Sequence, residues 1–308
     1  MAEQRAEDHQ SGIDHEITVN GVNLHYLDWG GQGPVLLFLT GLGNTAYIYD
    51  DLAPRFTDRF RVLGLTRRGH GRSDTTETGY DTGTLTEDVR AFLDALGIER
   101  ASFVGHSLAG DELTRFVTLY PERVDRLVYL DAAYDRSGMP DMMASLPVPL
   151  PEEGDQEWES WESAEAAVRR FYPAWTDAVA RELRELCVVG EDGRIRSRMS
   201  GTVEKALMTG TVASAPDFGR IVVPALSFYA YPADFSQAWG ELDPEDRAAV
   251  QRWTDEIFLP YTRENVERFR REVPLGRVVE MTESHHYCFL DRPEAVYEEM
   301  RDFLLASA

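Results

Sequence analysis

Hydrophobic and polar side chains follow two different periods along the chain. Short, mainly apolar runs such as residues 35–39 and 101–104 predict strands that are buried on both faces of a sheet. Between several of these runs, apolar residues recur every three or four positions, as in residues 85–96, and this spacing predicts helices. Strands that alternate with helices in this way are typical of an α/β fold with a mostly parallel sheet and helices on both of its faces. The same pattern predicts further strands at residues 60–65, 124–130, 221–229 and 277–281.

The alternation of strands and helices stops between residues 132 and 220. Proline, methionine, tryptophan and glutamate dominate residues 139–161, and helical patterns follow before the alternation resumes. We therefore expect a core domain formed by residues 13–131 and 221–308, with residues 132–220 inserted as a mainly helical cap (lid). Residues 1–12, which are mostly polar, are predicted to be a disordered N-terminus.

The charge of the chain is strongly negative. In 308 residues, 31 lysines and arginines stand against 54 aspartates and glutamates, which gives a formal charge of −23. Such a chain repels phosphate backbones and anionic membrane surfaces, so we expect neither nucleic acid nor a membrane as a partner. The start of the chain lacks the apolar run of a secretory signal, and no apolar stretch approaches the roughly 20 residues of a membrane span. With only Cys187 and Cys288 available for a disulfide, the sequence favours a cytoplasmic protein.

The most informative stretch joins a predicted strand to a predicted helix. Residues 105–110 read Gly-His-Ser-Leu-Ala-Gly, with an apolar run before them and a helical pattern after them. A serine at the apex of such a sharp turn usually accepts a strained backbone conformation, and small residues beside it let strand and helix approach each other. The stretch resembles the nucleophile elbow of the α/β-hydrolase family, with Ala109 in the place of a glycine. The resemblance implies an α/β-hydrolase fold in which Ser107 is the nucleophile.

The chain also offers a late histidine, which a serine nucleophile needs as its base. The family supplies its catalytic residues in the chain order serine, then aspartate or glutamate, then histidine. After the last predicted strand, residues 284–293 resemble the family's histidine loop, in which the histidine stands seven residues before the proline that opens the last helix. Counting back from Pro293, this spacing implies His286 as the base. Because the neighbouring His285 takes the usual place of a glycine, the assignment stays open by one residue.

Two aspartates are candidates for the acid that orients the histidine. The resemblance implies a position just past the strand before the histidine strand, where Asp234 follows residues 224–230. Residues 231–233, Tyr-Pro-Ala, depart there from the glycine-containing turn that is commoner in the family. Asp131, at the end of the predicted strand 124–130, occupies the family's other known position for this acid. We assign the role to Asp234 and keep Asp131 as the alternative.

The negative oxygen that forms during attack on an ester needs hydrogen-bond donors that are already in position. In the family, one donor is the backbone N–H of the residue after the nucleophile, which is Leu108 in this chain. The other comes from the loop after the third strand, where Thr40-Gly41-Leu42 resembles the family's His-Gly-x. The resemblance therefore implies an oxyanion hole formed by the N–H groups of Leu42 and Leu108.

A second motif competes with this interpretation. Residues 41–46 match Gly-x-Gly-x-x-Ala directly after a strand, as in a dinucleotide-binding site. Such a site carries an acidic ribose ligand about twenty residues further on, where this chain has Thr66-Arg67-Arg68. A dinucleotide site would also leave the elbow and the late histidine unexplained. Since no His-Glu-x-x-His or Cys/His ligand spacing occurs either, we expect no cofactor and no metal.

Together, the motifs predict a serine hydrolase that cleaves a carboxylic ester of a small, apolar substrate through an acyl-enzyme. Hydrolysis of a lactone, a thioester or a carbon–carbon bond, and cofactor-free perhydrolase or haloperoxidase chemistry, use the same groups and stay open. A non-catalytic protein of this fold that only binds a small ligand is the alternative of another class. Aromatic residues in and after the predicted cap indicate an aromatic-lined pocket: Trp158, Trp161, Phe171, Tyr172, Trp175, Tyr229, Tyr231, Phe235 and Trp239.

Overall fold

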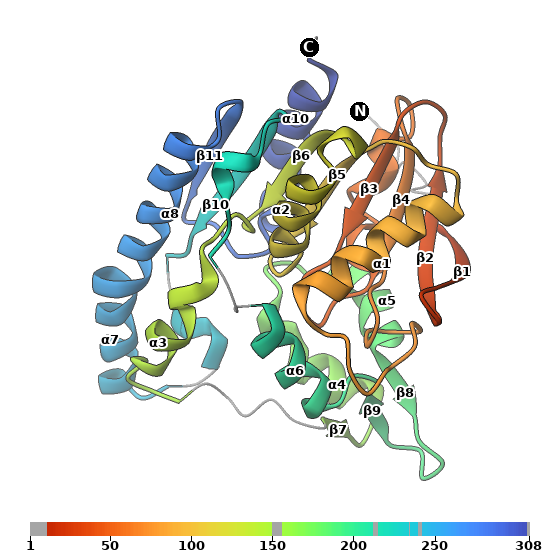
Figure 1. Cartoon of the computed structure of the whole chain (residues 1–308). Helices are drawn as coiled ribbons and strands as arrows, with labels where there is room; N and C mark the ends of the chain where they lie inside the picture. The colour runs from red at the N-terminus through yellow and green to blue at the C-terminus, as the bar shows by residue number, and fades with distance from the viewer. Residues whose placement is uncertain (1–10, 150–155, 212–214, 234, 240–241, 307–308) are drawn as a thin grey trace, which may run out of the picture.

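An eight-stranded sheet runs through the centre of the protein (Figure 1). The computed structural model describes residues 11–149, 156–211, 215–233, 235–239 and 242–306. In spatial order the strands are β1 (Ile13–Val19), β2 (Val22–Gly30), β4 (Arg61–Leu65), β3 (Val35–Leu39), β5 (Ala101–His106), β6 (Val124–Leu130), β10 (Ala225–Tyr231) and β11 (Gly276–Thr282). Strand β2 pairs antiparallel with β1 and β4, and all other neighbours pair in parallel. The predicted α/β fold with a mostly parallel sheet is thus confirmed.

Helices cover both faces of the sheet. One face carries α1 (Thr82–Ala95), α2 (Ala109–Leu119) and α8 (Leu259–Glu272), and the other carries α9 (Cys288–Asp291) and α10 (Pro293–Leu305). Successive side chains of a strand point to opposite faces, so Leu37 of β3 packs in the first layer and Phe38 in the second. Figure 1 shows α1 and α2 in front of the sheet and α10 behind it. This double burial explains why the central strands are apolar runs and do not alternate.

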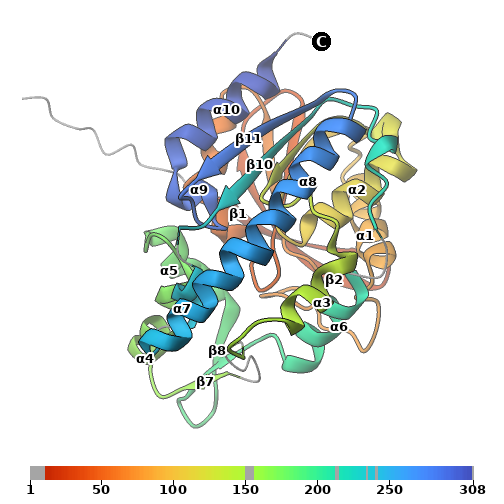
Figure 2. The same ribbon diagram turned by 90° about the vertical axis from the view of Figure 1, so that its left-hand side faces the viewer.

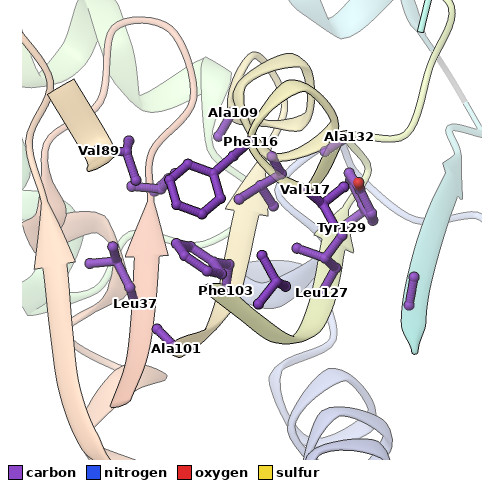
Figure 3. Packing of buried hydrophobic residues seen from close by; sticks show 14 of the residues in the cluster. Leu37, Val89, Ala101, Phe103, Ala109, Phe116, Val117, Leu127, Tyr129 and Ala132 are labelled. Carbon is purple, nitrogen blue, oxygen red and sulfur yellow. The ribbon is translucent and has the colours of Figure 1, made fainter. Parts of the chain in front are cut away.

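The layer between the sheet and α2 is packed around aromatic rings (Figure 3). The ring centroids of Phe103 in β5 and Phe116 in α2 lie 5.0 Å apart. Val89 of α1 and Leu37 of β3 extend the same layer toward the neighbouring strands. Because β5 and α2 are fixed against each other in this way, the turn that joins them has a defined position at the end of the sheet.

Between β6 and β10 the chain leaves the sheet, and we call residues 132–220 the insertion. It forms α3 (Met139–Ala144), α4 (Trp161–Val168), α5 (Asp177–Leu186) and α6 (Gly201–Thr211), together with a small antiparallel sheet in the order β7 (Glu157–Trp158), β9 (Ile195–Ser197) and β8 (Cys187–Val189). In Figure 1, α4, α6 and the small sheet gather below the large sheet. The sequence does not predict the small sheet, because its strands span only two or three residues and show no period.

A long helical segment follows β10. It consists of α7 (Pro244–Trp253), one π-helical turn (Thr254–Phe258) and α8. These elements continue one another diagonally across the front of the molecule in Figure 2. Phe258 from the π-helical turn lines the cavity described below. No helix in the described part of the chain is long and apolar enough to cross a membrane.

Candidate active site

Ser107 occupies the sharp turn between β5 and α2, as the sequence predicts. Its φ is +51°, a left-handed conformation that residues with a side chain seldom adopt. Two glycines make this turn possible, because a Cβ at Gly105 would lie 2.6 Å from Leu113 Cδ1, and one at Gly110 would lie 1.9 Å from the carbonyl oxygen of Ala132. The close approach of strand, helix and the chain after β6 therefore holds Ser107 in the wall of a cavity.

The imidazole of His286 is hydrogen-bonded to Asp131, whose carboxylate lies at the end of β6. The distance from His286 Nδ1 to Asp131 Oδ2 is 2.6 Å. The other carboxylate oxygen, Oδ1, accepts hydrogen bonds from the Tyr134 hydroxyl at 2.6 Å and from the Ala230 N–H at 3.0 Å. These three hydrogen bonds fix the buried carboxylate of Asp131, and the residue itself has a left-handed φ of +48°. Since Nδ1 donates to the carboxylate, Nε2 of a neutral His286 is the nitrogen that can accept a proton.

Four candidate site residues lie in the turns and loops that follow the parallel strands β3, β5, β6 and β11. Ser107, His286, Leu42 and Asp131 all line one cavity of about 550 Å³. Leu108 is buried at the start of α2, next to Ser107. Asp234, which the sequence analysis assigns as the acid, lies outside the described residues. Among the described residues, the carboxylate that is hydrogen-bonded to the His286 ring is that of Asp131, the alternative.

His285 has a different environment from its neighbour. Its Nδ1 accepts a hydrogen bond from the backbone N–H of Tyr287 at 3.1 Å, and its own N–H donates to Asp291 Oδ2 at 3.1 Å. Burial, together with the adjacent His286, lowers the pKa of His285 to about 4. The ring is thus neutral near pH 7, and its Nδ1 is already occupied by a backbone donor.

The loop after β3 passes directly over Ser107. A Cβ on Gly41 would lie 3.3 Å from Ser107 Cβ and 2.8 Å from His106 Nδ1, so the residue must be a glycine for this approach. The buried guanidinium of Arg67 donates to the carbonyl oxygens of Thr40 at 2.6 Å and of Gly41 at 2.9 Å. All peptide bonds described are trans, so the N–H of Leu42 points away from the Gly41 carbonyl and hence away from Arg67.

The insertion and the helices after β10 provide most of the cavity wall. Of the aromatic residues predicted to line a pocket, Trp158, Phe171, Tyr172 and Phe235 do so. Trp161 and Trp175 instead pack against a small apolar cluster inside the insertion. The wall also contains aliphatic and charged side chains, among them Val168, Leu183, Leu186, Met199, Arg136, Arg170 and Glu204. The cavity is therefore mainly apolar, with charged groups at separate points of its wall.

Sequence reasoning missed several side chains that hold the site together. Arg67 fixes the loop over Ser107, and its partner Glu112 on α2 is buried with it at an N–O distance of 2.5 Å. Tyr134 supports Asp131, while Asn44 and Glu182 join the same loop to the insertion. These are single polar residues that no motif singles out, so no local signal identifies their roles. Among the described residues, no group of three or more histidine, cysteine, aspartate or glutamate side chains is arranged to hold a metal ion.

A family model described as alpha/beta hydrolase fold matches residues 34–221, which is more than half of the chain. Among solved structures, E-2-(acetamidomethylene)succinate hydrolase superposes with a TM-score of 0.73 and 22% sequence identity, over 96% of this chain and 100% of that one. At this identity, the superposition shows that the fold is shared.

Curated relatives match the chain over shorter stretches. A 2-(acetamidomethylene)succinate hydrolase of Mesorhizobium japonicum is 31% identical over 131 residues, which cover 42% of this chain and 46% of the relative. A bifunctional esterase/perhydrolase of Acinetobacter calcoaceticus is 36% identical over 111 residues, which cover 35% of this chain and 40% of the relative. The matched region thus spans less than half the length of either relative.

Proposed function

Because the chain belongs to the α/β-hydrolase fold family, we propose that it is a serine hydrolase that cleaves carboxylic esters of small molecules through an acyl-enzyme. In this proposal Ser107 is the nucleophile, His286 the general base and Asp131 the residue that orients the base. The observation that supports it most is the 2.6 Å hydrogen bond between His286 and Asp131, in a cavity that Ser107 also lines. The relatives named as hydrolase and esterase/perhydrolase support the same class of reaction.

The proposed reaction has two halves. Ser107 Oγ attacks the ester carbonyl while His286 Nε2 takes its proton, and the N–H groups of Leu42 and Leu108 stabilise the resulting oxyanion. The protonated His286 then gives its proton to the leaving alcohol, so that the acyl group remains on Ser107. In the second half His286 removes a proton from water, the water oxygen attacks the acyl-enzyme, and the carboxylic acid is released with the proton returned to Ser107.

The assignment of the acid changes from the sequence-based one. Asp131 Oδ2 accepts the hydrogen bond from His286 Nδ1, and Asp131 Oδ1 accepts hydrogen bonds from Tyr134 and Ala230. A carboxylate with these partners keeps the imidazole in the tautomer that the base needs and stabilises the imidazolium that forms. We therefore propose Asp131 in place of Asp234.

The cavity supports a small and largely apolar substrate. Its volume of about 550 Å³ is within the range usual for small-molecule sites, and aromatic side chains such as Trp158 and Phe171 contribute to its wall. We propose that residues 132–220 act as the cap that encloses this substrate. Both cysteines, Cys187 and Cys288, are buried and free, which is compatible with the proposed cytoplasmic location.

A panel of 4-nitrophenyl esters tests this function. Turnover of short and medium acyl esters, with a burst of one equivalent of nitrophenol when deacylation is slow, supports an acyl-enzyme. If hydrogen peroxide replaces water as the second nucleophile, the product is a peracid, which a halide-bromination assay detects. The relative named as an esterase/perhydrolase makes this second activity worth measuring beside the first. Absence of turnover on the whole panel would favour a protein that only binds its ligand.

The rate should depend on pH through a histidine base. We expect kcat/KM for a neutral ester to rise with pH over the range from about 5 to 8, because only a neutral imidazole can accept the Ser107 proton. His285 is not the source of this rise, since its pKa of about 4 leaves it neutral over the whole range. His285→Gln should therefore keep the pH profile and retain kcat within about threefold. If His285→Gln instead loses this dependence of kcat/KM on pH, His285 is the base.

A further inference from the structure

Glu182 is a buried carboxylate that the proposed reaction does not use. It lies on α5 in the insertion and has no exposed surface. Its Oε1 accepts hydrogen bonds from the backbone N–H of Thr45 at 2.7 Å and from the side-chain amide of Asn44 at 3.2 Å. Its Oε2 accepts one from the Thr45 hydroxyl. All three donors belong to the loop that passes over Ser107 with Gly41 and ends at Thr45.

Asn44 extends this network to the histidine loop. Its side-chain oxygen accepts a hydrogen bond from the Tyr287 hydroxyl at 3.1 Å, and its amide also reaches the Tyr172 hydroxyl at 3.4 Å. Tyr287 directly follows His286, and its ring centroid lies 4.8 Å from that of His106, the residue before Ser107. One polar network thus joins three segments: the loop after β3 (residues 40–45, here called the oxyanion loop), the insertion and the histidine loop.

Burying the carboxylate of Glu182 costs folding free energy, so its presence points to a role for its charge. A buried ionised group loses its hydration, and the three donors around Glu182 are neutral amide and hydroxyl groups. Burial accordingly raises the pKa of Glu182 to about 8, although the hydrogen bonds from Thr45 and Asn44 oppose the shift. A neutral glutamine would fill the same space and keep an oxygen acceptor without burying a charge, so packing alone does not explain the residue.

We propose that Glu182 is a positioning residue for the oxyanion hole: it fixes Asn44 and Thr45, and through them the peptide that presents the Leu42 N–H to the oxyanion. This inference rests on the proposed function. Glu182 is absent from the cavity wall, which its helix neighbours Leu183 and Leu186 help to form. Its loss should therefore change kcat, which depends on the oxyanion, and leave KM nearly unchanged.

The ionised form of Glu182 holds the loop better than the protonated form. A carboxylate can accept all three hydrogen bonds, whereas a protonated oxygen must donate and gives up one acceptor site. Near Glu182, Glu185 is paired with Arg72 at 2.9 Å. Burial raises the pKa values of Tyr47, Tyr49, Tyr172 and Cys187, so these hydroxyl and thiol groups do not ionise near pH 8. Four titratable groups interact electrostatically with Glu182: Tyr49, Tyr172, Glu185 and Cys187. Tyr47 interacts in turn with Glu185.

Stability should depend on pH in the opposite direction to activity. Glu182 in the folded protein has a pKa of about 8 and an ordinary value of 4.5 when exposed, so the unfolded chain releases this proton first as the pH rises. Between about pH 5 and pH 8 this group therefore makes the folded state progressively less stable. We expect the Tm of Glu182→Gln, relative to the Tm of the wild type, to rise as the pH is raised over this interval, and thermal melting measures both values. A difference in Tm that stays constant with pH would contradict the raised pKa.

The test compares Glu182→Gln, Glu182→Ala and the control Glu185→Gln, which changes the same residue type on the same helix. Glu182→Gln imitates the protonated form, so its kcat on a neutral ester should be within about twofold of wild type at pH 6 and about tenfold lower at pH 9, with KM unchanged. Glu182→Ala should lose about tenfold or more at both pH values, and Glu185→Gln should keep the wild-type kcat. The rate of labelling by a fluorophosphonate should follow kcat.

The outcomes separate the two proposals. If the wild type turns over esters and Glu182→Gln matches it at every pH, the positioning role is wrong while the proposed function stands. If the kcat of Glu182→Gln falls only where its Tm falls as well, the role is merely structural and the inference is overturned. A wild type that neither hydrolyses esters nor reacts with the fluorophosphonate overturns the proposed function, and the positioning role with it.

Discussion

Ser107→Ala should lower kcat for a neutral ester by about 10⁴-fold or more. The variant keeps the cavity and the loop after β3 but has no oxygen that can form an acyl-enzyme. A fluorophosphonate should label the wild type with one equivalent on Ser107, because the reagent imitates the tetrahedral intermediate, and should leave Ser107→Ala unlabelled. Steady-state kinetics and mass mapping of the labelled peptide measure the two effects.

Ser137→Ala is the matched control for this experiment. Ser137 is an exposed serine in the insertion and does not line the cavity, so its variant should keep wild-type kinetics and labelling. An adduct on a serine other than Ser107, or a Ser107→Ala variant with wild-type kcat, would show that the elbow serine is not the nucleophile. Either result would remove the basis of the proposed ester hydrolysis.

Asp131→Asn should lower kcat by about 10⁴-fold while the protein stays folded. An asparagine whose amide group faces His286 Nδ1 donates where the aspartate accepts, and so favours the imidazole tautomer with its proton on Nε2. That nitrogen then cannot take the proton of Ser107. The asparagine oxygen can still accept the hydrogen bonds from Tyr134 and Ala230, so the fold around it should be retained. Circular dichroism and thermal melting beside the kinetics separate lost chemistry from lost structure.

Asp234→Asn provides the comparison that decides the acid. We expect this variant to retain kcat within about threefold, since the aspartate hydrogen-bonded to His286 is Asp131. If Asp234→Asn is folded and inactive and Asp131→Asn is active, the sequence-based assignment is correct and the one proposed from the structure is wrong. The role of Ser107 would survive that result.

The strands and the elbow could be predicted because their causes are local. A strand buried on both faces must be apolar throughout, as β3 and β5 are. The turn at Ser107 needs small neighbours, and Gly105 and Gly110 are visible in the sequence at the positions where a Cβ would collide. The short strands of the insertion have no such local signature, so the sequence predicts only the helices of the insertion.

The partner of the histidine could not be predicted from local pattern. Asp131 and Asp234 both follow a strand of the sheet, and chain position alone favours the latter. What brings Asp131 to His286 is a left-handed φ of +48° together with support from Tyr134 and Ala230, which come from two different segments. A backbone angle of this kind at a non-glycine residue leaves no mark in the sequence.

Glu182 escaped prediction for a different reason. Residues 177–186 read Asp-Ala-Val-Ala-Arg-Glu-Leu-Arg-Glu-Leu, in which charged and apolar residues alternate as on a surface helix. Nothing in this pattern separates the buried Glu182 from Glu185, which is partly exposed in an ion pair. Only the position of α5 against the loop after β3 makes the difference.

The contact between Glu182 and Thr45 limits how the parts of this protein can be exchanged. Apolar walls tolerate replacement of one side chain by another of similar volume, so the shape of the cavity can change residue by residue during evolution. A graft of an insertion that lacks a carboxylate at this place would leave the N–H and hydroxyl of Thr45 without an acceptor in a buried position. A chimaera therefore needs an acceptor on the incoming helix, or matched changes at Asn44 and Thr45, before it can inherit a new substrate range.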